Sequence, residues 1–249
     1  MGFKVINHSS PTYIVAEMSA NHGGNFDKAI AIIHAAKESG ANAIKLQTYR
    51  ADTITLDSEK DDFLIPSENP WESHKTLFSL YEKASTPWEW HERLILEGKK
   101  LGMDVFSSPF DCSAVDFLES LNVSAYKIAS PEITDIPLIK KIGETRKPVI
   151  LSTGVATLED IALAVKILQD QGCPGIVILK CTTAYPAPPE EINLRTIPHM
   201  AEMFNCLVGI SDHTLGVGVP IAAVSLGAKV IEKHFTLERD ESSVDDFFS

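Results

Sequence analysis

The feature that most constrains the fold of this chain is an alternation of short apolar runs with longer segments of helical periodicity. Apolar runs of four or five residues that are rich in Val and Ile are typical of buried parallel strands. A helix between successive runs allows each strand to point in the same direction as the last. Eight such runs predict an α/β protein with a closed TIM (β/α)8 barrel. The predicted strands are Tyr13–Glu17, Ala43–Gln47, Asp104–Ser107, Ala125–Ala129, Val149–Ser152, Ile176–Lys180, Val208–Ser211 and Lys229–Lys233.

One long segment interrupts this regular alternation. Residues Tyr49–Ser85 are polar and aromatic, contain prolines and Trp71, and are too many for a simple connection. We expect this segment to fold over the mouth of the barrel as a substrate loop. Capping boxes predict the starts of two helices, at Thr86–Glu89 and at Thr157–Asp160.

Composition and charge narrow the class of protein. The 249 residues are 44% hydrophobic and 22% charged, which suits one globular barrel domain over residues 1–249. A formal net charge of −12 and the lack of a basic run argue against a nucleic-acid surface. No apolar stretch could span a membrane and no secretory leader is evident, so we expect a cytoplasmic protein. The cysteine spacings match neither a redox pair nor a zinc site, which predicts buried free thiols at Cys112, Cys173, Cys181 and Cys206.

Polar residues follow the predicted strands at their carboxyl ends, where barrel enzymes carry their reactive groups. Lys45 and Lys127 are each flanked by apolar residues within a strand, and a lysine in such a place normally needs an anion. With hydroxyl groups from neighbouring strand ends, they would form an arc of donors suited to a phosphate and a carboxylate. The alternative is internal salt bridges, for instance with Glu17 or Glu132. The hydroxyl groups belong to Ser108, Ser130, Ser152 and Ser211.

Two histidines, His213 and His234, each stand just beyond a predicted strand, on neighbouring strands of one face. Neutral imidazoles suit Mn²⁺, Fe²⁺, Co²⁺ or Zn²⁺, and two of them leave coordination positions for water and a substrate oxygen. The alternative is a pair of core histidines that the protein itself satisfies. The histidines expected at the surface are His8, His34, His74, His91 and His199.

The strand-end motifs occur in a characteristic order along the chain. They are Ala16-Glu17-Met18-Ser19-Ala20-Asn21-His22, Lys45-Leu46-Gln47-Thr48, Phe106-Ser107-Ser108-Pro109-Phe110-Asp111, Tyr126-Lys127-Ile128-Ala129-Ser130, Leu151-Ser152-Thr153-Gly154, Cys181-Thr182-Thr183-Ala184-Tyr185-Pro186, Gly209-Ile210-Ser211-Asp212-His213-Thr214 and Glu232-Lys233-His234-Phe235-Thr236. This set resembles the catalytic barrel of the N-acetylneuraminate (sialic acid) synthase family across nearly the whole chain. The resemblance implies a phosphoenolpyruvate-dependent transferase that forms a C–C bond. In that reaction C3 of phosphoenolpyruvate attacks the aldehyde of an open-chain amino sugar, water attacks C2, and phosphate leaves by C–O cleavage.

The resemblance also implies a role for each motif residue. Phosphoenolpyruvate would be contacted by Lys45, Ser108, Lys127, Ser130, Ser152 and Ser211. A divalent metal, Mn²⁺ foremost with Mg²⁺ or Co²⁺ as alternatives, would be held by His213 and His234 and would polarise the aldehyde oxygen. Near the metal or the aldehyde would lie Glu17 and Gln47. The acetamido-sugar would be held by Glu132, Thr183, Tyr185 and Asp245, although Asp245 taken alone also fits a solvated acidic loop.

Departures from the family pattern resemble the pseudaminic acid synthase branch. Glu17-Met18-Ser19 stands where neuraminate synthases have Glu-Ile-Gly, Thr183 stands where they have asparagine, and Val244–Ser249 replaces an Asp-His loop. These departures favour 2,4-diacetamido-2,4,6-trideoxy-L-altrose over N-acetylmannosamine as the sugar. The methyl group at C6 of that sugar would favour apolar neighbours such as Phe247 or Phe248.

Other functions stay open at this point. One is N-acetylneuraminate or legionaminate synthesis by the same chemistry. Another is an octulosonate or heptulosonate phosphate synthase, which would need a further basic cluster that the sequence does not show. The third is a catalytically silent, truncated barrel that binds its ligands without turnover.

The chain ends at Ser249, soon after the eighth predicted strand. Family members usually continue through an eighth helix into a small C-terminal antifreeze-like domain, which contributes to the partner subunit's sugar site in a dimer. We therefore expect a C-terminally truncated barrel, with the apolar outer surface of its first and last strands exposed. For the full-length form we expect a homodimer.

Overall fold

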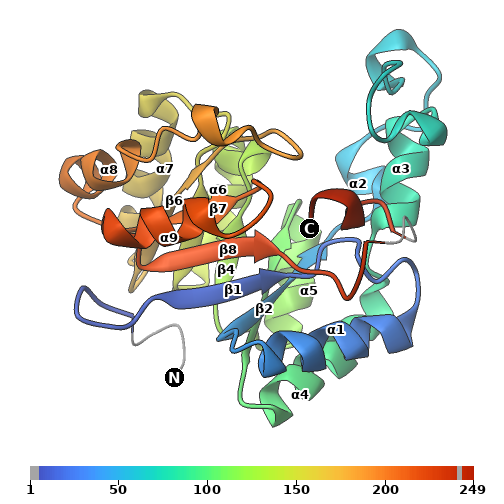
Figure 1. Cartoon of the computed structure of the whole chain (residues 1–249). Helices are drawn as coiled ribbons and strands as arrows, with labels where there is room; N and C mark the ends of the chain where they lie inside the picture. The colour runs from blue at the N-terminus through green and yellow to red at the C-terminus, as the bar shows by residue number, and fades with distance from the viewer. Residues whose placement is uncertain (1–5, 240–242) are drawn as a thin grey trace.

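The computed structural model describes residues 6–239 and 243–249; the expectation about a leader falls partly on residues 1–5, outside them. Eight parallel strands close into a barrel in strand order, with β8 paired to β1 (Figure 1). The predicted barrel is confirmed, and predicted strand ends differ from the observed ones by at most two residues. The strands are β1 (Tyr13–Glu17), β2 (Ala43–Thr48), β3 (Asp104–Pro109), β4 (Tyr126–Ile128), β5 (Val149–Ser152), β6 (Ile176–Cys181), β7 (Leu207–Asp212) and β8 (Val230–His234).

Helices between the strands cover the outside of the barrel. The helix α7 begins at the predicted capping box, in which Thr157 and Asp160 each accept a hydrogen bond from the other's backbone N–H. The box predicted at Thr86–Glu89 is wrong, because the Thr86 hydroxyl lies 3.2 Å from Nε2 of His22 instead. The outer helices are α1 (Phe26–Glu38), α4 (His91–Lys100), α5 (Cys112–Ser120), α6 (Ile136–Glu144), α7 (Leu158–Asp170), α8 (Thr196–Phe204) and α9 (Gly218–Ser225).

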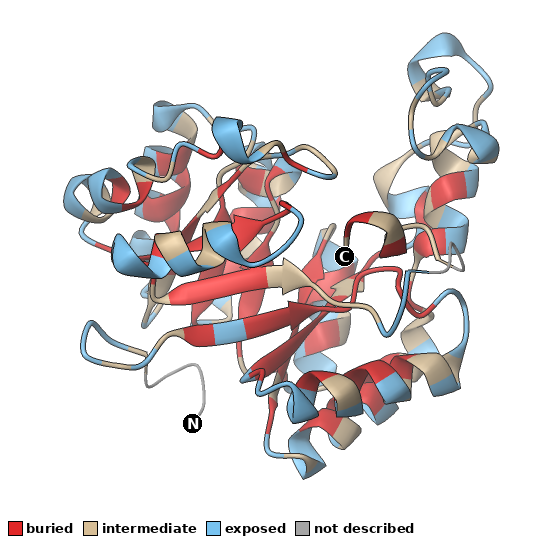
Figure 2. Ribbon diagram, in the orientation of Figure 1, coloured by how far each residue is buried: buried red, intermediate tan, exposed pale blue. Residues whose placement is uncertain are grey.

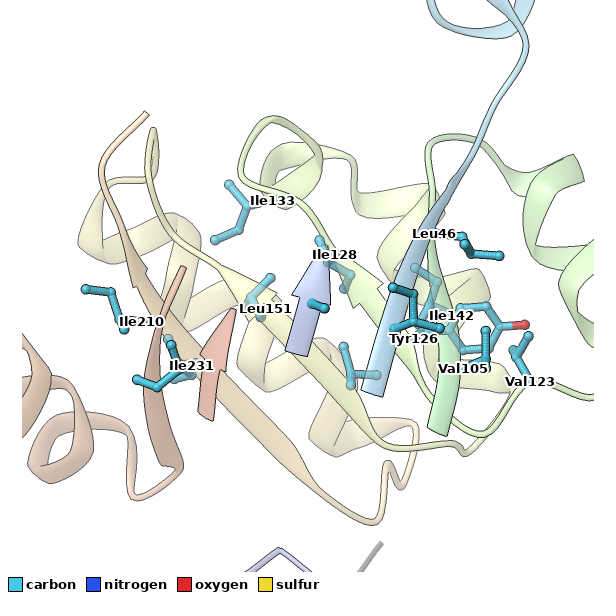
Figure 3. Packing of buried hydrophobic residues seen from close by; sticks show 14 of the residues in the cluster. Leu46, Val105, Val123, Tyr126, Ile128, Ile133, Ile142, Leu151, Ile210 and Ile231 are labelled. Carbon is cyan, nitrogen blue, oxygen red and sulfur yellow. The ribbon is translucent and has the colours of Figure 1, made fainter. Parts of the chain in front are cut away.

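The pleat of the strands divides the core into two parts. Successive strand residues point alternately outward, against the helices, and inward, into the barrel. The outward residues form the main apolar core, in which Leu46, Tyr126 and Ile210 pack between strands and helices (Figure 3). The inward residues at the amino-terminal end form a second apolar cluster that includes Phe106 and Ile150. Further along the strands the inward positions become polar, although they stay buried (Figure 2).

Two segments lie over the carboxyl ends of the strands. The long segment after β2 forms α2 (Ala51–Ile54) and α3 (Leu77–Ala84), which Figure 1 shows rising from the barrel beside the C-terminus. The C-terminal segment forms a 3-10 turn at Asp246–Phe248, in which the Phe248 side chain is buried. Trp71 joins the two segments, because its indole N–H donates to the carbonyl of Val244 at 2.7 Å. The expected position of residues 49–85 at the barrel mouth is confirmed, and their role as a substrate loop stays a prediction.

The outer surface of β1 and β8 is only partly exposed. Ile14 points outward and is 37% exposed, whereas Ala16 and Ile231 are buried on the same surface. The expected exposure of this surface is therefore confirmed at Ile14 and is wrong at Ala16 and Ile231. Within residues 6–239 and 243–249, no helix combines the length and apolar character needed to cross a membrane.

Candidate active site

The period-two alternation of the strands gathers most of the predicted site residues in one layer at the carboxyl end of the barrel. Inward positions of β1, β2 and β4 carry Glu17, Lys45 and Lys127, all at most 4% exposed. A second inward position of β2, inward positions of other strands, and a residue directly after β7 complete the layer. These are Gln47, Ser108, Ser152, Ser211, His213 and His234.

The two lysines form a buried ion-pair cluster with two glutamates. Lys45 Nζ lies 2.7 Å from Oε2 of Glu17 and 3.1 Å from Oε1 of Glu232, and Lys127 Nζ lies 3.5 Å from the same Glu232 oxygen. Burial lowers the pKa of Lys45 to about 8, against the opposing effect of Glu232. Lys45 is therefore still cationic at neutral pH. The alternative of internal salt bridges is confirmed for Glu17 but does not remove the donors, because each ammonium carries three N–H groups.

Glu232 is a site residue that the sequence analysis missed. It is the inward residue two before His234 on β8, and its Oε1 also accepts a hydrogen bond from the Ser211 hydroxyl at 3.2 Å. Burial would raise the pKa of Glu232, but Lys127 and Lys45 hold it below the usual range of a carboxyl group. The sequence does contain a signal for this residue. Glu232 is two positions before His234, and residues two apart in a strand point to the same face, so Glu232 also points into the barrel.

The four serine hydroxyls differ in whether they form a hydrogen bond within the protein. Ser211 donates to Glu232, and Ser130 accepts from the backbone N–H of Gly154 at 2.9 Å. The hydroxyls of Ser108 and Ser152 are buried and have no hydrogen-bond partner among the described residues. Buried hydroxyls normally have a partner, so these two are donors suited to a bound ligand beside the lysines.

His213 and His234 lie close enough to share a ligand, with ring centroids 5.5 Å apart. Nδ1 of His213 lies 2.9 Å from the carbonyl of Thr182, and because a carbonyl only accepts, Nδ1 carries a proton and donates it there. Burial lowers the pKa of His234 well below its ordinary value, so its imidazole is neutral. Nδ1 of His234 is buried without a partner among the described residues. A buried imidazole nitrogen without a partner, beside the ring of a second histidine, fits a divalent metal ion.

The number of protein ligands for such a metal is small. Within the described residues, no group of three or more His, Cys, Asp or Glu side chains is arranged to hold a metal ion. A metal on two imidazoles keeps coordination positions for water and for oxygen atoms of a substrate.

A cavity of about 530 Å³ opens directly above this layer. Its polar lining residues include Gln47, Glu132, Tyr185, His234 and Asp245, and most of the remaining lining residues are apolar or aromatic. The apolar lining comes mainly from both covering segments, with one residue from directly after β3, and includes Tyr49, Ile54, Ile65, Trp71, Leu77, Leu80, Tyr81, Phe110 and Phe248.

Asp245 and Tyr185 are held in place at the mouth. The Asp245 carboxylate accepts hydrogen bonds from the hydroxyl of Ser19 and, at 3.3 Å, from the N–H of Ala20. The Tyr185 ring packs on His213 with centroids 4.4 Å apart. Thr183 is not among the residues that line the cavity; its hydroxyl lies 2.1 Å from where a Cβ on Gly154 would be.

Two sequence-based expectations about buried residues are wrong. His91 is completely buried rather than at the surface, because its ring packs on Phe117 and Nε2 lies 2.8 Å from the Thr48 hydroxyl. Cys112 is exposed, since it opens α5 at the surface. The four cysteines are free thiols as expected.

Cys181 belongs to the site layer, which the sequence analysis did not foresee. It ends β6 at an inward, buried position. Burial acts to raise the pKa of Cys181, but hydrogen bonding with His213 and Ser130 and the charge of Lys127 lower it to about 7.

Glu132 makes a testable contribution to the pH dependence of stability. Burial raises the pKa of Glu132 from 4.5 to about 7. Between these values the folded protein binds more protons than the unfolded chain, so the free energy of unfolding should fall as pH rises. Glu132→Gln should remove this pH-dependent fall. The free energy of unfolding of the variant minus that of the original protein should therefore increase from pH 4.5 to 7 and then level off.

Urea denaturation of both proteins across this pH range measures the difference. The matched control is Glu159→Gln on α7, where the side chain is exposed and the change should be independent of pH. Parallel pH profiles for the original protein and Glu132→Gln would contradict the raised pKa.

The fold and the site together define the class: a TIM barrel with a buried polar site at the carboxyl ends of its strands, where barrel enzymes carry out their chemistry. The model of the NeuB family matches residues 32–249. The chain therefore belongs to the NeuB family.

Individual relatives agree with this assignment. The chain is 44% identical over 243 residues to pseudaminic acid synthase of Campylobacter jejuni. The matched region covers 98% of this chain and 70% of the relative. It is 39% identical over 237 residues to N,N'-diacetyllegionaminic acid synthase of the same species, covering 94% of the chain and 70% of the relative. Among solved structures, N-acetylneuraminic acid synthetase of Leptospira borgpetersenii in complex with citrate superposes with a TM-score of 0.85 at 30% identity, covering 96% of this chain and 78% of that one.

Proposed function

We propose that this chain condenses phosphoenolpyruvate with the aldehyde of an open-chain acetamido-sugar, giving a nonulosonic acid and phosphate. The observation that carries the proposal is the pair of buried lysines beside the unpartnered hydroxyls of Ser108 and Ser152. Relatives that are named synthases of three such acids support the reaction class. The 44% identity to a pseudaminic acid synthase favours the 2,4-diacetamido-2,4,6-trideoxy sugar.

The lysine cluster would bind the anionic groups of phosphoenolpyruvate. Lys45 and Lys127 supply charge in a layer shielded from water, where ion pairs and charge-assisted hydrogen bonds are stronger than at the surface. Ser108 and Ser152 would donate to the same groups, because no described residue accepts from them. Glu232 and Glu17 balance the two lysines until the ligand binds.

The reaction forms a C–C bond and a C–O bond from C2 to water, and it breaks the C–O bond from C2 to phosphate. C3 of phosphoenolpyruvate bonds to the aldehyde carbon, whose oxygen becomes a hydroxyl group by taking up a proton. Water adds to C2, and cleavage of the C2–O bond releases phosphate and leaves a ketone. A divalent metal on His213 and His234 would act as a Lewis acid that polarises the aldehyde oxygen.

Residues around the cavity would orient the sugar for this attack. Gln47 Nε2 lies 3.3 Å from Glu17 and 3.0 Å from the Ser19 hydroxyl, which fixes its amide near the imidazole pair. Glu132, Tyr185 and Asp245 line the cavity and would bind hydroxyl and amide groups. The apolar residues of the lining suit the methyl groups of two acetamido substituents and of a 6-deoxy sugar. Holding both substrates in one shielded cavity removes much of the entropic barrier.

Phosphate release from phosphoenolpyruvate in the presence of Mn²⁺ tests this proposal. We expect release with 2,4-diacetamido-2,4,6-trideoxy-L-altrose, little with N-acetylmannosamine, and none without sugar. Release with N-acetylmannosamine alone would overturn the choice of sugar while keeping the reaction class. Binding of phosphoenolpyruvate without release with any of the sugars would overturn the proposed activity.

A further inference from the structure

An ion pair lies on the outer surface of the barrel directly behind the two histidines. Asp212 and Lys233 face each other in the register of β7 and β8, and Lys233 Nζ lies 2.7 Å from Oδ2 of Asp212. Both residues point outward, because their neighbours His213 and His234 point into the barrel. The side chain of Asp212 is fully buried, and that of Lys233 is 25% exposed.

The same two side chains also bind Thr214, the residue directly after His213. The other carboxylate oxygen of Asp212 accepts from the backbone N–H of Thr214 at 3.1 Å and from its hydroxyl at 2.8 Å. Lys233 Nζ donates to the carbonyl of Thr214. Asp212 and Thr214, the two neighbours of His213 in the chain, are therefore both bonded to Lys233, which directly precedes His234.

This arrangement limits how the two imidazoles can move relative to each other. The His213 ring is already fixed at Nδ1 by the Thr182 carbonyl, so its position depends on the backbone that carries it. The backbone of His213 is joined to the end of β8 by the Asp212, Lys233 and Thr214 contacts rather than by strand pairing, which ends at Asp212. A pair of metal ligands must keep a fixed separation, and the partners that orient ligands affect metal affinity.

We propose that Asp212 and Lys233 are positioning residues that hold His213 and His234 at the separation a divalent metal requires. The inference rests on the proposed function, because it assumes that the two histidines bind the metal. Neither side chain lines the cavity, so neither is expected to contact a substrate. A purely structural ion pair would stabilise the barrel without a selective effect on the metal.

Titration with Mn²⁺ alone, with free Mn²⁺ followed by electron paramagnetic resonance, measures the effect without turnover. Asp212→Asn and Lys233→Gln should each weaken Mn²⁺ binding by about 10-fold or more, the effect typical of residues that orient metal ligands. Lys233→Arg should retain most of the affinity, because an arginine can also pair with Asp212 and the Thr214 carbonyl. The double variant should lose little more than either single variant, since the two residues act as one unit.

Metal-free binding of phosphoenolpyruvate provides the selective comparison. We expect it to be nearly unchanged in Asp212→Asn and Lys233→Gln, because the lysine cluster lies on the opposite face of the strands. The matched control is Lys166→Gln, which removes an exposed ion pair with Asp170, at 2.8 Å on α7, and should change neither affinity.

Each other outcome overturns the inference in a recognisable way. Unchanged Mn²⁺ affinity in either folded variant would overturn the positioning role of the ion pair and would leave the proposed function standing. Equal losses of Mn²⁺ and phosphoenolpyruvate binding would reduce the ion pair to a structural role. An original protein that binds no Mn²⁺ would overturn the proposed metal site together with this inference.

Discussion

His213→Ala is expected to lower phosphate release at saturating Mn²⁺ by about 1000-fold while leaving the barrel folded. The loss follows from removing one of two imidazoles on which a Lewis acid worth several kcal/mol would depend. The residue lies just beyond the carboxyl end of β7 and outside the apolar core, so circular dichroism should show the same helix and strand content. His234→Ala should have an effect of similar size, because its ring faces that of His213.

The matched control is His199→Ala, which removes an exposed imidazole from α8 and should leave the rate unchanged. Addition of more Mn²⁺ should not restore His213→Ala fully, since the remaining ring offers one ligand. Full activity of either variant at the Mn²⁺ concentration that the original protein needs would remove these histidines from the metal site.

Lys127→Met is expected to weaken binding of phosphoenolpyruvate by about 100-fold, because it removes a buried ammonium that would bond to the anion. It should also lower the free energy of unfolding by about 3 to 5 kcal/mol, since Glu232 loses one of its two cationic partners. Calorimetric titration measures the first effect and urea denaturation the second.

A double variant separates the two effects. Lys127→Met with Glu232→Gln removes both charges, so stability should recover in large part whereas affinity for phosphoenolpyruvate should stay low. The control is Lys37→Met on α1, where the lysine is exposed and neither quantity should change. Recovery of affinity in the double variant would show that Lys127 acts only as a partner of Glu232.

Much of the site could be predicted because strand chemistry is periodic. A buried parallel strand shows its residues alternately to the helices and to the barrel interior, so Lys45 and Lys127 had to face inward once Ile44 and Ile128 faced the helices. The same rule places Glu232 beside them and Cys181 under His213, and both could have been found by applying it to every strand. The predicted roles of Thr183 and of the serines as substrate contacts stay predictions.

Other features had no periodic signal. The hydrogen bond between Trp71 and Val244 joins residues 173 positions apart, and Phe248 packs on Tyr185, which lies on a different loop. The burial of His91 depends on Phe117 and Thr48, which lie on two different elements. Local sequence contains no record of such pairings, because they arise when separate helices and loops pack on one barrel.

The sequence by itself determined the eight-stranded barrel, the inward or outward direction of each strand residue, and the family. These depend on local alternation and on motifs, which are properties of neighbouring residues. Only the tertiary structure decided which charges pair, which hydroxyls lack a partner, and which imidazole nitrogen is free. Those properties depend on distances of a few ångströms between side chains from different strands, because electrostatic and hydrogen-bond energies change steeply over that range.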